Sequence, residues 1–242
     1  SGYRAGGFNR GGIIAETSGY DADTLWNYEF GVRTSWLDSR LTANAVAYYV
    51  DWSDIQLRSF DVSTLSSRIL NVGKAEVLGL DTEVRYQATD NLGLSVNYGY
   101  ADATMAEDFL DVSIDPPTVI AAEGDTLPGS SKHTVALLID WQIPLTATLD
   151  LQANASYIYN SSRESSLGAN ASALSGFEDI PSFEIINLSA GVRHDNGVTL
   201  SFFAKNLLDE RAIQFEGRIG TALTSATINR PRTIGLNVGY SF

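Results

Sequence analysis

Alternation of apolar and polar residues with a period of two runs along almost the whole chain. In the run LWNYEFGVRTSW (25–36), Trp26 and Tyr28 fall on one side, and Asn27 and Glu29 fall on the other. Successive side chains of a β-strand point to opposite faces, so this pattern predicts strands. The ten expected strands cover 2–9, 25–36, 41–51, 79–88, 92–101, 133–142, 147–159, 185–193, 198–206 and 233–242.

The connections between these segments alternate strictly between short and long. Turns of three or four residues lie at 37–40, 89–91, 143–146 and 194–197. Long connections lie at 10–24, 52–75, 103–131, 160–181 and 207–230. Alternate connections of an antiparallel sheet emerge at opposite ends, so one end is trimmed and the other carries large loops. This asymmetry is typical of transmembrane β-barrels, and it predicts an all-β transmembrane antiparallel β-barrel.

A soluble β-sandwich or lipocalin-like barrel is the alternative, because alternation alone does not say which face is buried. Aromatic residues at both ends of the apolar face favour the membrane arrangement. Trp26 and Trp36 are ten residues apart on that face, roughly 33 Å along a strand and roughly 25 Å after a tilt of about 40°. The apolar band of an outer-membrane barrel has this height. A helical membrane protein is excluded, since the longest apolar runs, such as 135–139, are far below the ~18 residues required.

The composition excludes further classes of protein. The chain has 29 Asp and Glu against 16 Lys and Arg, a net charge of −13, so it lacks the basic surface of a nucleic-acid binder. With no cysteine and only His133 and His194, it offers no thiolate metal site and little histidine chemistry. The sequence contains no G-x-S-x-G, P-loop, H-E-x-x-H or G-x-G-x-x-G motif. We therefore expect no enzymatic activity, no catalytic residues, no metal site and no cofactor.

Several segments together resemble one family. They are YRAGGFN (3–9), LWNYEFGVRTSWLDSRLTANAVAYYVDWSDIQ (25–56), NVGKAEVLGLDTEVRYQ (71–87), GDTLPGSSKHT (124–134), AKNLLDERA (204–212) and RPRTIGLNVGYSF (230–242). In this order they are similar to the C-terminal part of a TonB-dependent outer-membrane receptor. The resemblance implies a 22-stranded barrel around an N-terminal plug, which needs roughly 530 residues for the barrel alone. Residues 1–242 are therefore expected to form a single partial domain, about the last ten strands, without the plug or the TonB box.

The resemblance also implies a function. Such receptors bind a scarce nutrient in the outer membrane of a Gram-negative bacterium and import it using the TonB-ExbB-ExbD complex, which engages the plug and TonB box. A ferric siderophore is the expected cargo, with a carbohydrate, a vitamin or another metal as alternatives. The further expected partners are outer-membrane lipid, lipopolysaccharide and the barrel-assembly machinery.

The expected site residues fall into three groups. Candidate ligand contacts in the long loops are Arg58, Arg163, Arg211, Arg218, Tyr20, Trp52, Phe60 and Phe215, followed by Arg68, Arg230 and Phe177. Arginine forks suit an anionic chelate, and aromatic rings suit flat ring ligands. The expected membrane-interface aromatics are Trp26, Trp36, Tyr49, Tyr86, Tyr100, Trp141 and Tyr159. The closing residues Leu236, Val238, Tyr240 and Phe242 resemble the family's assembly signal.

Two rival interpretations stay open at this point. One is a self-standing ten-stranded barrel, either an adhesin or a protease. A protease would need a histidine at the outer rim, but His194 lies in a short turn and His133 has lipid-facing parity. The other rival is a soluble secreted β protein that binds carbohydrate. The acidic connection 103–131 is expected to be a solvated loop, and the NLLDE motif (206–210) is expected to be structural.

Overall fold

One ten-stranded antiparallel sheet dominates the computed structural model, which describes residues 1–9, 19–61, 66–111, 118–165, 167, 179–219 and 223–241. The spatial order of its strands is β1-β4-β5-β8-β9-β12-β13-β14-β15-β18. Their bounds are β1 Gly2–Arg4, β4 Asp23–Trp36, β5 Leu41–Ser53, β8 Ala75–Thr89, β9 Leu92–Met105, β12 His133–Pro144, β13 Leu149–Asn160, β14 Phe183–His194, β15 Val198–Lys205 and β18 Thr233–Tyr240. Each main strand pairs with its neighbours along the chain, as ten segments joined by alternating connections predict. Over the described residues, no helix has the length and apolar character needed to span a membrane.

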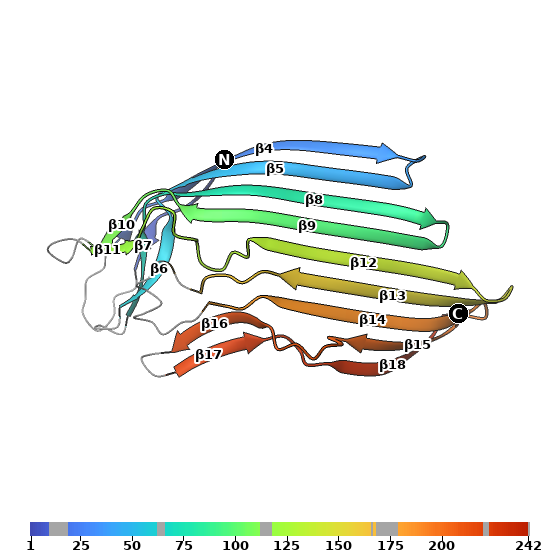
Figure 1. Cartoon of the computed structure of the whole chain (residues 1–242). Helices are drawn as coiled ribbons and strands as arrows, with labels where there is room; N and C mark the ends of the chain where they lie inside the picture. Colours follow the sequence, from blue (N-terminus) through green and yellow to red (C-terminus); the bar gives the residue numbers. More distant parts are fainter. Residues whose placement is uncertain are drawn as a thin grey trace.

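The expected long loops contain strands of their own, which the prediction missed. The expected strand 2–9 is also divided, because only Gly2–Arg4 joins the sheet and Gly7–Phe8 pairs with Gly19–Tyr20. The described residues form four small hairpins. They are β2 Gly7–Phe8 with β3 Gly19–Tyr20, β6 Gln56–Asp61 with β7 Ser66–Asn71, β10 Phe109–Asp111 with β11 Thr118–Ala121, and β16 Ile213–Ile219 with β17 Leu223–Ile228. Segments of two to seven residues are too short for a two-residue period to stand out. The three that are labelled in Figure 1 lie at the end of the sheet opposite the short turns, and the fourth contacts one of them through β3 and β7. We refer to this end as the outer end.

The main strands also run further toward the outer end than predicted. β8 begins at Ala75 rather than at 79, β9 continues to Met105, and β4 begins at Asp23. The alternation fades there because apolar side chains of the core beneath the hairpins cover the face that is polar further along the strands, whereas Glu76 and Thr24 on the other face are exposed. Ala75 and Met105, paired across β8 and β9, are both buried.

The register of the strands makes one face of the sheet continuously apolar. Trp26, Tyr28 and Phe30 of β4 are 57%, 58% and 73% exposed, and Tyr28 lies opposite Tyr49 of β5 with ring centroids 6.4 Å apart. The ladder carries this face across the sheet to β18, where Leu236 remains 71% exposed. So many large exposed apolar side chains on one face of the sheet require an apolar medium on that side.

The opposite face is polar and is held by short-range contacts between neighbouring strands. Asn44 of β5 donates to a carboxylate oxygen of Glu83 at 3.1 Å, and the guanidinium of Arg85 is paired with the other. Tyr48 lies across Gly79, where an added Cβ would come within 1.9 Å of the ring. The glycine therefore makes room for an aromatic ring on an otherwise polar wall.

A small apolar core lies under the hairpins at the outer end. We call it the outer loop core, and it consists of Ile55, Val72, Ala75, Ala103, Met105, Ala121 and Leu127. Trp52, Leu57, Leu70, Val77, Phe109 and Leu167 pack against it. Its members come from β8, β9 and β11, from the segment after β11 and from the segments around hairpin β6–β7, so it joins connections that are distant in sequence.

Candidate ligand-binding surface

The buried carboxylate of Asp23 ties three segments together at the outer end. It accepts hydrogen bonds from the backbone N–H of Arg4 at 3.1 Å, from Trp52 Nε1 at 3.2 Å and from the backbone N–H of Gln56 at 3.2 Å. The Arg4 guanidinium forms an ion pair with it, donates from Nε at 2.8 Å, and lies 5.1 Å from the centre of the Trp52 ring. Burial raises the pKa of Asp23, but these hydrogen bonds and the Arg4 charge lower it more, so its pKa lies below the usual value.

Three amide side chains extend this network to hairpin β6–β7. Gln56 Nε2 donates to the carbonyl oxygens of Asp21 at 2.9 Å and Ala5 at 3.1 Å. Asn71 exchanges two hydrogen bonds with the backbone of Asp21, at 2.8 and 3.0 Å. Asn9 does the same with Ile69, at 2.6 and 2.9 Å. The N-terminal segment thus fixes the position of the hairpin.

Hydrogen bonds of the Asn206 side chain likewise fix the base of hairpin β16–β17. It is 4% exposed with a φ of 51°, and its side-chain amide donates to the carbonyl oxygens of Glu210 at 2.9 Å and Arg230 at 3.0 Å. Its Oδ1 accepts the backbone N–H of Glu210 at 2.9 Å. Asp209 accepts the N–H of Arg232 at 2.8 Å. These contacts give the NLLDE motif the structural role expected of it.

Arg163 reaches the base of this hairpin from a segment distant in the sequence. Arg163, which follows β13, donates from its guanidinium to the carbonyl oxygens of Ile213 at 3.1 Å and Gln214 at 2.8 Å. Its own backbone forms a two-bond bridge with Ile180, at 2.9 and 3.0 Å. Arg211 is exposed just before β16. The surface therefore combines positive charge from the β13–β14 and β15–β18 connections.

A pair of acids lies next to Arg163. Burial, followed by a hydrogen bond shared with Asp179 and the charges of Asp179 and Asp125, raises the pKa of Glu164. Two buried polar atoms in the described part of the chain lack a hydrogen-bond partner, Ser165 Oγ and Asn229 Nδ2, and both belong to segments around this base.

Some of the candidate ligand contacts are engaged by other residues of the chain, and others are exposed. Trp52 is engaged by Asp23 and Arg4, and Tyr20 lies against Gly7, where an added Cβ would approach its hydroxyl to 2.7 Å. Arg163 contacts backbone carbonyls, and Arg211 and Arg230 are exposed. The side chains of Arg58, Arg68, Phe60, Phe177, Arg218 and Phe215 lie outside the described residues. Ligand binding by any of these residues stays a prediction.

All seven expected interface aromatics fall on the apolar face. The cross-strand pairs that show this include Trp36 with Leu41, Leu41 with Tyr86, and Trp141 with Leu92. Tyr100 lies opposite His133, whose Nδ1 is 2.9 Å from the hydroxyl of Tyr98. Trp26, Tyr49 and Tyr159 share this face. Leu236, Val238 and Tyr240 lie exposed on the same face of β18, and Phe242 lies outside the described residues.

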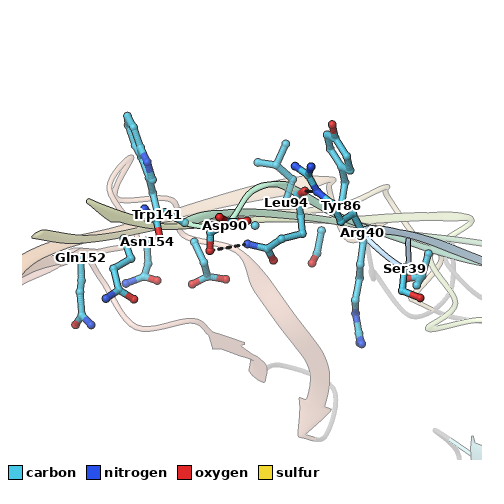
Figure 2. Close-up of a pocket in the computed structure, with 16 residues that line it drawn as sticks. Ser39, Arg40, Tyr86, Asp90, Leu94, Trp141, Gln152 and Asn154 are labelled. Atoms are coloured by element: carbon cyan, nitrogen blue, oxygen red, sulfur yellow. Dashed lines mark hydrogen bonds between the residues drawn. The ribbon is translucent and has the colours of Figure 1, made fainter. Parts of the chain in front are cut away.

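A polar hollow of about 690 Å³ lies on the other face, close to the short turns. Figure 2 shows Gln152 and Asn154 on this side of the sheet, with Trp141 and Tyr86 on the opposite side. Arg40 and Arg85 line one part of the hollow and Asp140 lines another. None of the described residues form a group of three or more His, Asp or Glu side chains placed to hold a metal ion.

The fold and its two unlike faces define the class: a segment of the wall of a transmembrane antiparallel β-barrel with elaborated outer loops. A family model, TonB dependent receptor-like β-barrel, matches residues 1–207. The chain belongs to this family of receptors, which confirms the resemblance seen in its motifs. This membership excludes the two rival interpretations, a soluble β protein and a self-standing ten-stranded barrel.

Solved structures share the fold. The ferric yersiniabactin uptake receptor FyuA from Yersinia pestis aligns over 100% of this chain and 34% of its own, with a TM-score of 0.74 and 19% identity. The siderophore receptor PiuA from Acinetobacter baumannii aligns over 91% and 29%, with a TM-score of 0.69 and 18% identity. The copper transporter OprC aligns over 92% and 31%, with a TM-score of 0.64 and 19% identity. The chain thus spans about a third of the length of these structures.

Proposed function

We propose that this chain is part of an outer-membrane receptor of a Gram-negative bacterium that imports a ferric siderophore with energy from the TonB-ExbB-ExbD complex. The family match over residues 1–207 supports the part of the proposal that makes this protein a TonB-dependent receptor. Siderophore receptors among the structural neighbours support the cargo. The apolar face would contact lipid, and the polar face would line the lumen.

The surface at the outer end supports a negatively charged cargo. Arg163, Arg211, Arg230 and Arg232 supply four of the chain's 16 basic residues around one hairpin base, in a protein of net charge −13. Guanidinium groups bind carboxylate and catecholate oxygens with paired hydrogen bonds. Such a concentration of arginine in an acidic protein favours an anionic ligand over a neutral sugar.

Uptake by cells tests the proposal directly. The full-length receptor is expressed in cells lacking their own siderophore receptors, and accumulation of radioactive iron is measured with a panel of ferric chelates. We expect iron uptake that disappears when TonB is deleted. Uptake independent of TonB would refute the class, and the transport of a vitamin, sugar or copper without any ferric chelate would refute the cargo.

A further inference from the structure

A short bridge holds together two parts of the β13–β14 connection. The backbone N–H of Arg163 donates to the carbonyl oxygen of Ile180 at 3.0 Å, and the N–H of Ile180 donates to the carbonyl oxygen of Arg163 at 2.9 Å. Ile180 is buried, with 4% of its surface exposed. Glu164 and Asp179 flank the bridge, one on each of its two segments. We call these four residues the clasp.

The clasp joins three connections of the outer end. The Arg163 guanidinium donates to the carbonyl oxygens of Ile213 and Gln214 in hairpin β16–β17, at 3.1 and 2.8 Å. The carbonyl oxygen of Glu164 accepts the backbone N–H of Gly129, in the β11–β12 connection, at 2.9 Å. A change in the clasp is therefore transmitted to both neighbouring connections.

Hairpin β16–β17 depends on such links more than hairpins β6–β7 and β10–β11 do. Hairpin β6–β7 packs Leu57 and Leu70 against the outer loop core, and hairpin β10–β11 contributes Phe109 and Ala121. Among the described side chains, hairpin β16–β17 contributes none to this core. Its position relative to the β13–β14 connection is set by the hydrogen bonds of Arg163.

Three carboxyl groups interact at the clasp. The side chains of Glu164 and Asp179 share a hydrogen bond, which requires a proton on one of them, and Asp125 of the β11–β12 connection adds its negative charge. Within the part of the chain that the structure describes, none of the three forms an ion pair with a base. Arg163 is engaged by backbone carbonyls, and Lys132, the first base after Asp125 in the sequence, pairs with a different carboxylate. The shared proton therefore limits the repulsion among these acids.

The direction of the pH response follows from this proton. Burial, the hydrogen bond with Asp179 and the charges of Asp179 and Asp125 raise the pKa of Glu164 above its ordinary value. The contribution of the protonated pair to stability is fully present below the ordinary glutamate pKa of about 4.3 and is lost as the pH rises through the raised value. Once the proton leaves, three carboxylates repel one another beside the bridge.

We propose that the clasp is a pH-dependent link between the outer connections. With a proton shared by Glu164 and Asp179 it holds hairpin β16–β17 through Arg163, and without that proton it opens and releases the hairpin. This inference goes beyond the transport function and does not depend on the cargo. The Asp23 network has the opposite response, because its carboxylate must be ionised to pair with Arg4 beside hairpin β6–β7. The two hairpins are therefore loosened at opposite ends of the pH range.

Hydrogen exchange of the purified full-length receptor between pH 4 and 8 tests this proposal, after correction for the pH dependence of intrinsic exchange. We expect the protection of the β16 and β17 amides to fall by roughly two- to tenfold as the pH rises, the range for the net loss of one hydrogen bond. Glu164→Gln cannot ionise but keeps a hydrogen-bonding side chain, so it should hold the protection at its acidic level up to pH 8. Arg163→Ala should lower the protection at every pH and remove its pH dependence.

The matched control is Glu123→Gln, which removes the charge of an exposed acid at the same end of the molecule. Its β16 and β17 amides should keep the pH dependence of the wild type. The β6 and β7 amides provide an internal reference, since their protection should not fall between pH 4 and 8.

Asp179→Asn is the second neutral variant, and it should behave as Glu164→Gln does. The melting temperature at pH 8 shows that each variant is folded. Protection of β16 and β17 that does not change with pH in the wild type would overturn the proposal. It would also fail if either neutral variant, once folded, kept the pH dependence of the wild type.

Discussion

The sheet and the outer loop core solve the problem of burial in opposite ways. Along the sheet, Phe30 and Leu236 are more than two-thirds exposed on the apolar face, and charged residues such as Glu83 and Arg85 line the other face. In the outer loop core, Ile55 and Ala75 are 0% exposed, as in a soluble protein. The apolar face of the sheet requires an external apolar medium, whereas the apolar side chains of the outer loop core bury one another. Substitutions that look alike should therefore have different effects in the two regions.

The largest contrast is expected from truncating a core residue. Ile55→Ala leaves a cavity under hairpin β6–β7 and should destabilise the outer end by about 2–5 kcal/mol. Hydrogen exchange should show faster exchange of backbone amides in β6 and β7 with little change in β12 or β13. Val96→Ala, on the apolar face of β9, is the control, and its hairpin amides should exchange as in the wild type. Unchanged exchange in Ile55→Ala would mean that the hairpin does not depend on the core.

Adjacent leucines of β12 test the two faces of the sheet. Leu137 lies opposite Val96 on the apolar face, whereas Leu138 lies opposite Ser95 on the polar face, and their exposures are similar at 37% and 41%. Leu137→Arg should cost about 2–4 kcal/mol, the penalty for arginine in the middle of the lipid. Leu138→Arg should cost much less.

Urea unfolding of the full-length receptor in lipid vesicles, followed by its shifted mobility on gels, measures this difference. A cost that is equal for the two substitutions would contradict the assignment of the faces.

The sequence predicted the nine long strands of the sheet and their faces, because each long strand alternates between a side chain facing one medium and a side chain facing the other over eight or more residues. It did not predict that the first expected strand, 2–9, is divided into Gly2–Arg4 in the sheet and Gly7–Phe8 in a separate hairpin. The alternation alone assigns Trp26 and Trp141 to the apolar face, and the strand register agrees. The same rule could not find the small hairpins, since strands such as β2 and β10 hold two or three residues. It also could not predict the outer loop core, which depends on contacts between distant segments such as Ile55 and Leu127.

The site was harder to predict because a residue type does not reveal its partners. Trp52 and Arg163 are predicted ligand contacts, yet in the structure they donate hydrogen bonds to Asp23 and to backbone carbonyls, respectively. Arg4 belongs to a recognised motif, but its ion pair joins residues 19 positions apart that no local pattern links.

Asp23 gives the outer end a dependence on pH that the apolar face lacks. Its pKa is lowered in the folded protein, so its contribution to stability is present above the ordinary carboxyl pKa of about 3.9 and is lost as the pH falls through the lower folded value. Asp23→Asn should destabilise the outer end by about 1–3 kcal/mol at neutral pH, because the Arg4 guanidinium loses its counter-ion.

Limited proteolysis between pH 3 and 7 checks this expectation, using a protease that is active over the whole range. The wild type should become more susceptible in acid near Gln56, and Asp23→Asn should be susceptible at every pH. The control Asp140→Asn, on the polar face of β12, should behave as the wild type. A wild type whose outer end resists proteolysis equally at pH 3 and pH 7 would exclude this role for Asp23.

The smallest effect is expected from two glycines of the polar face. Gly79→Ala would bring a methyl group within 1.9 Å of the Tyr48 ring, whereas in Gly31→Ala the nearest atom, Val46 Cγ2, is 3.4 Å away. Displacing the ring should cost about 1–3 kcal/mol in Gly79→Ala. The second substitution should be neutral or slightly stabilising, because alanine restricts the unfolded chain. Equal melting temperatures for the two variants would show that Tyr48 can move into the lumen freely, and that the polar wall tolerates repacking that the outer loop core does not.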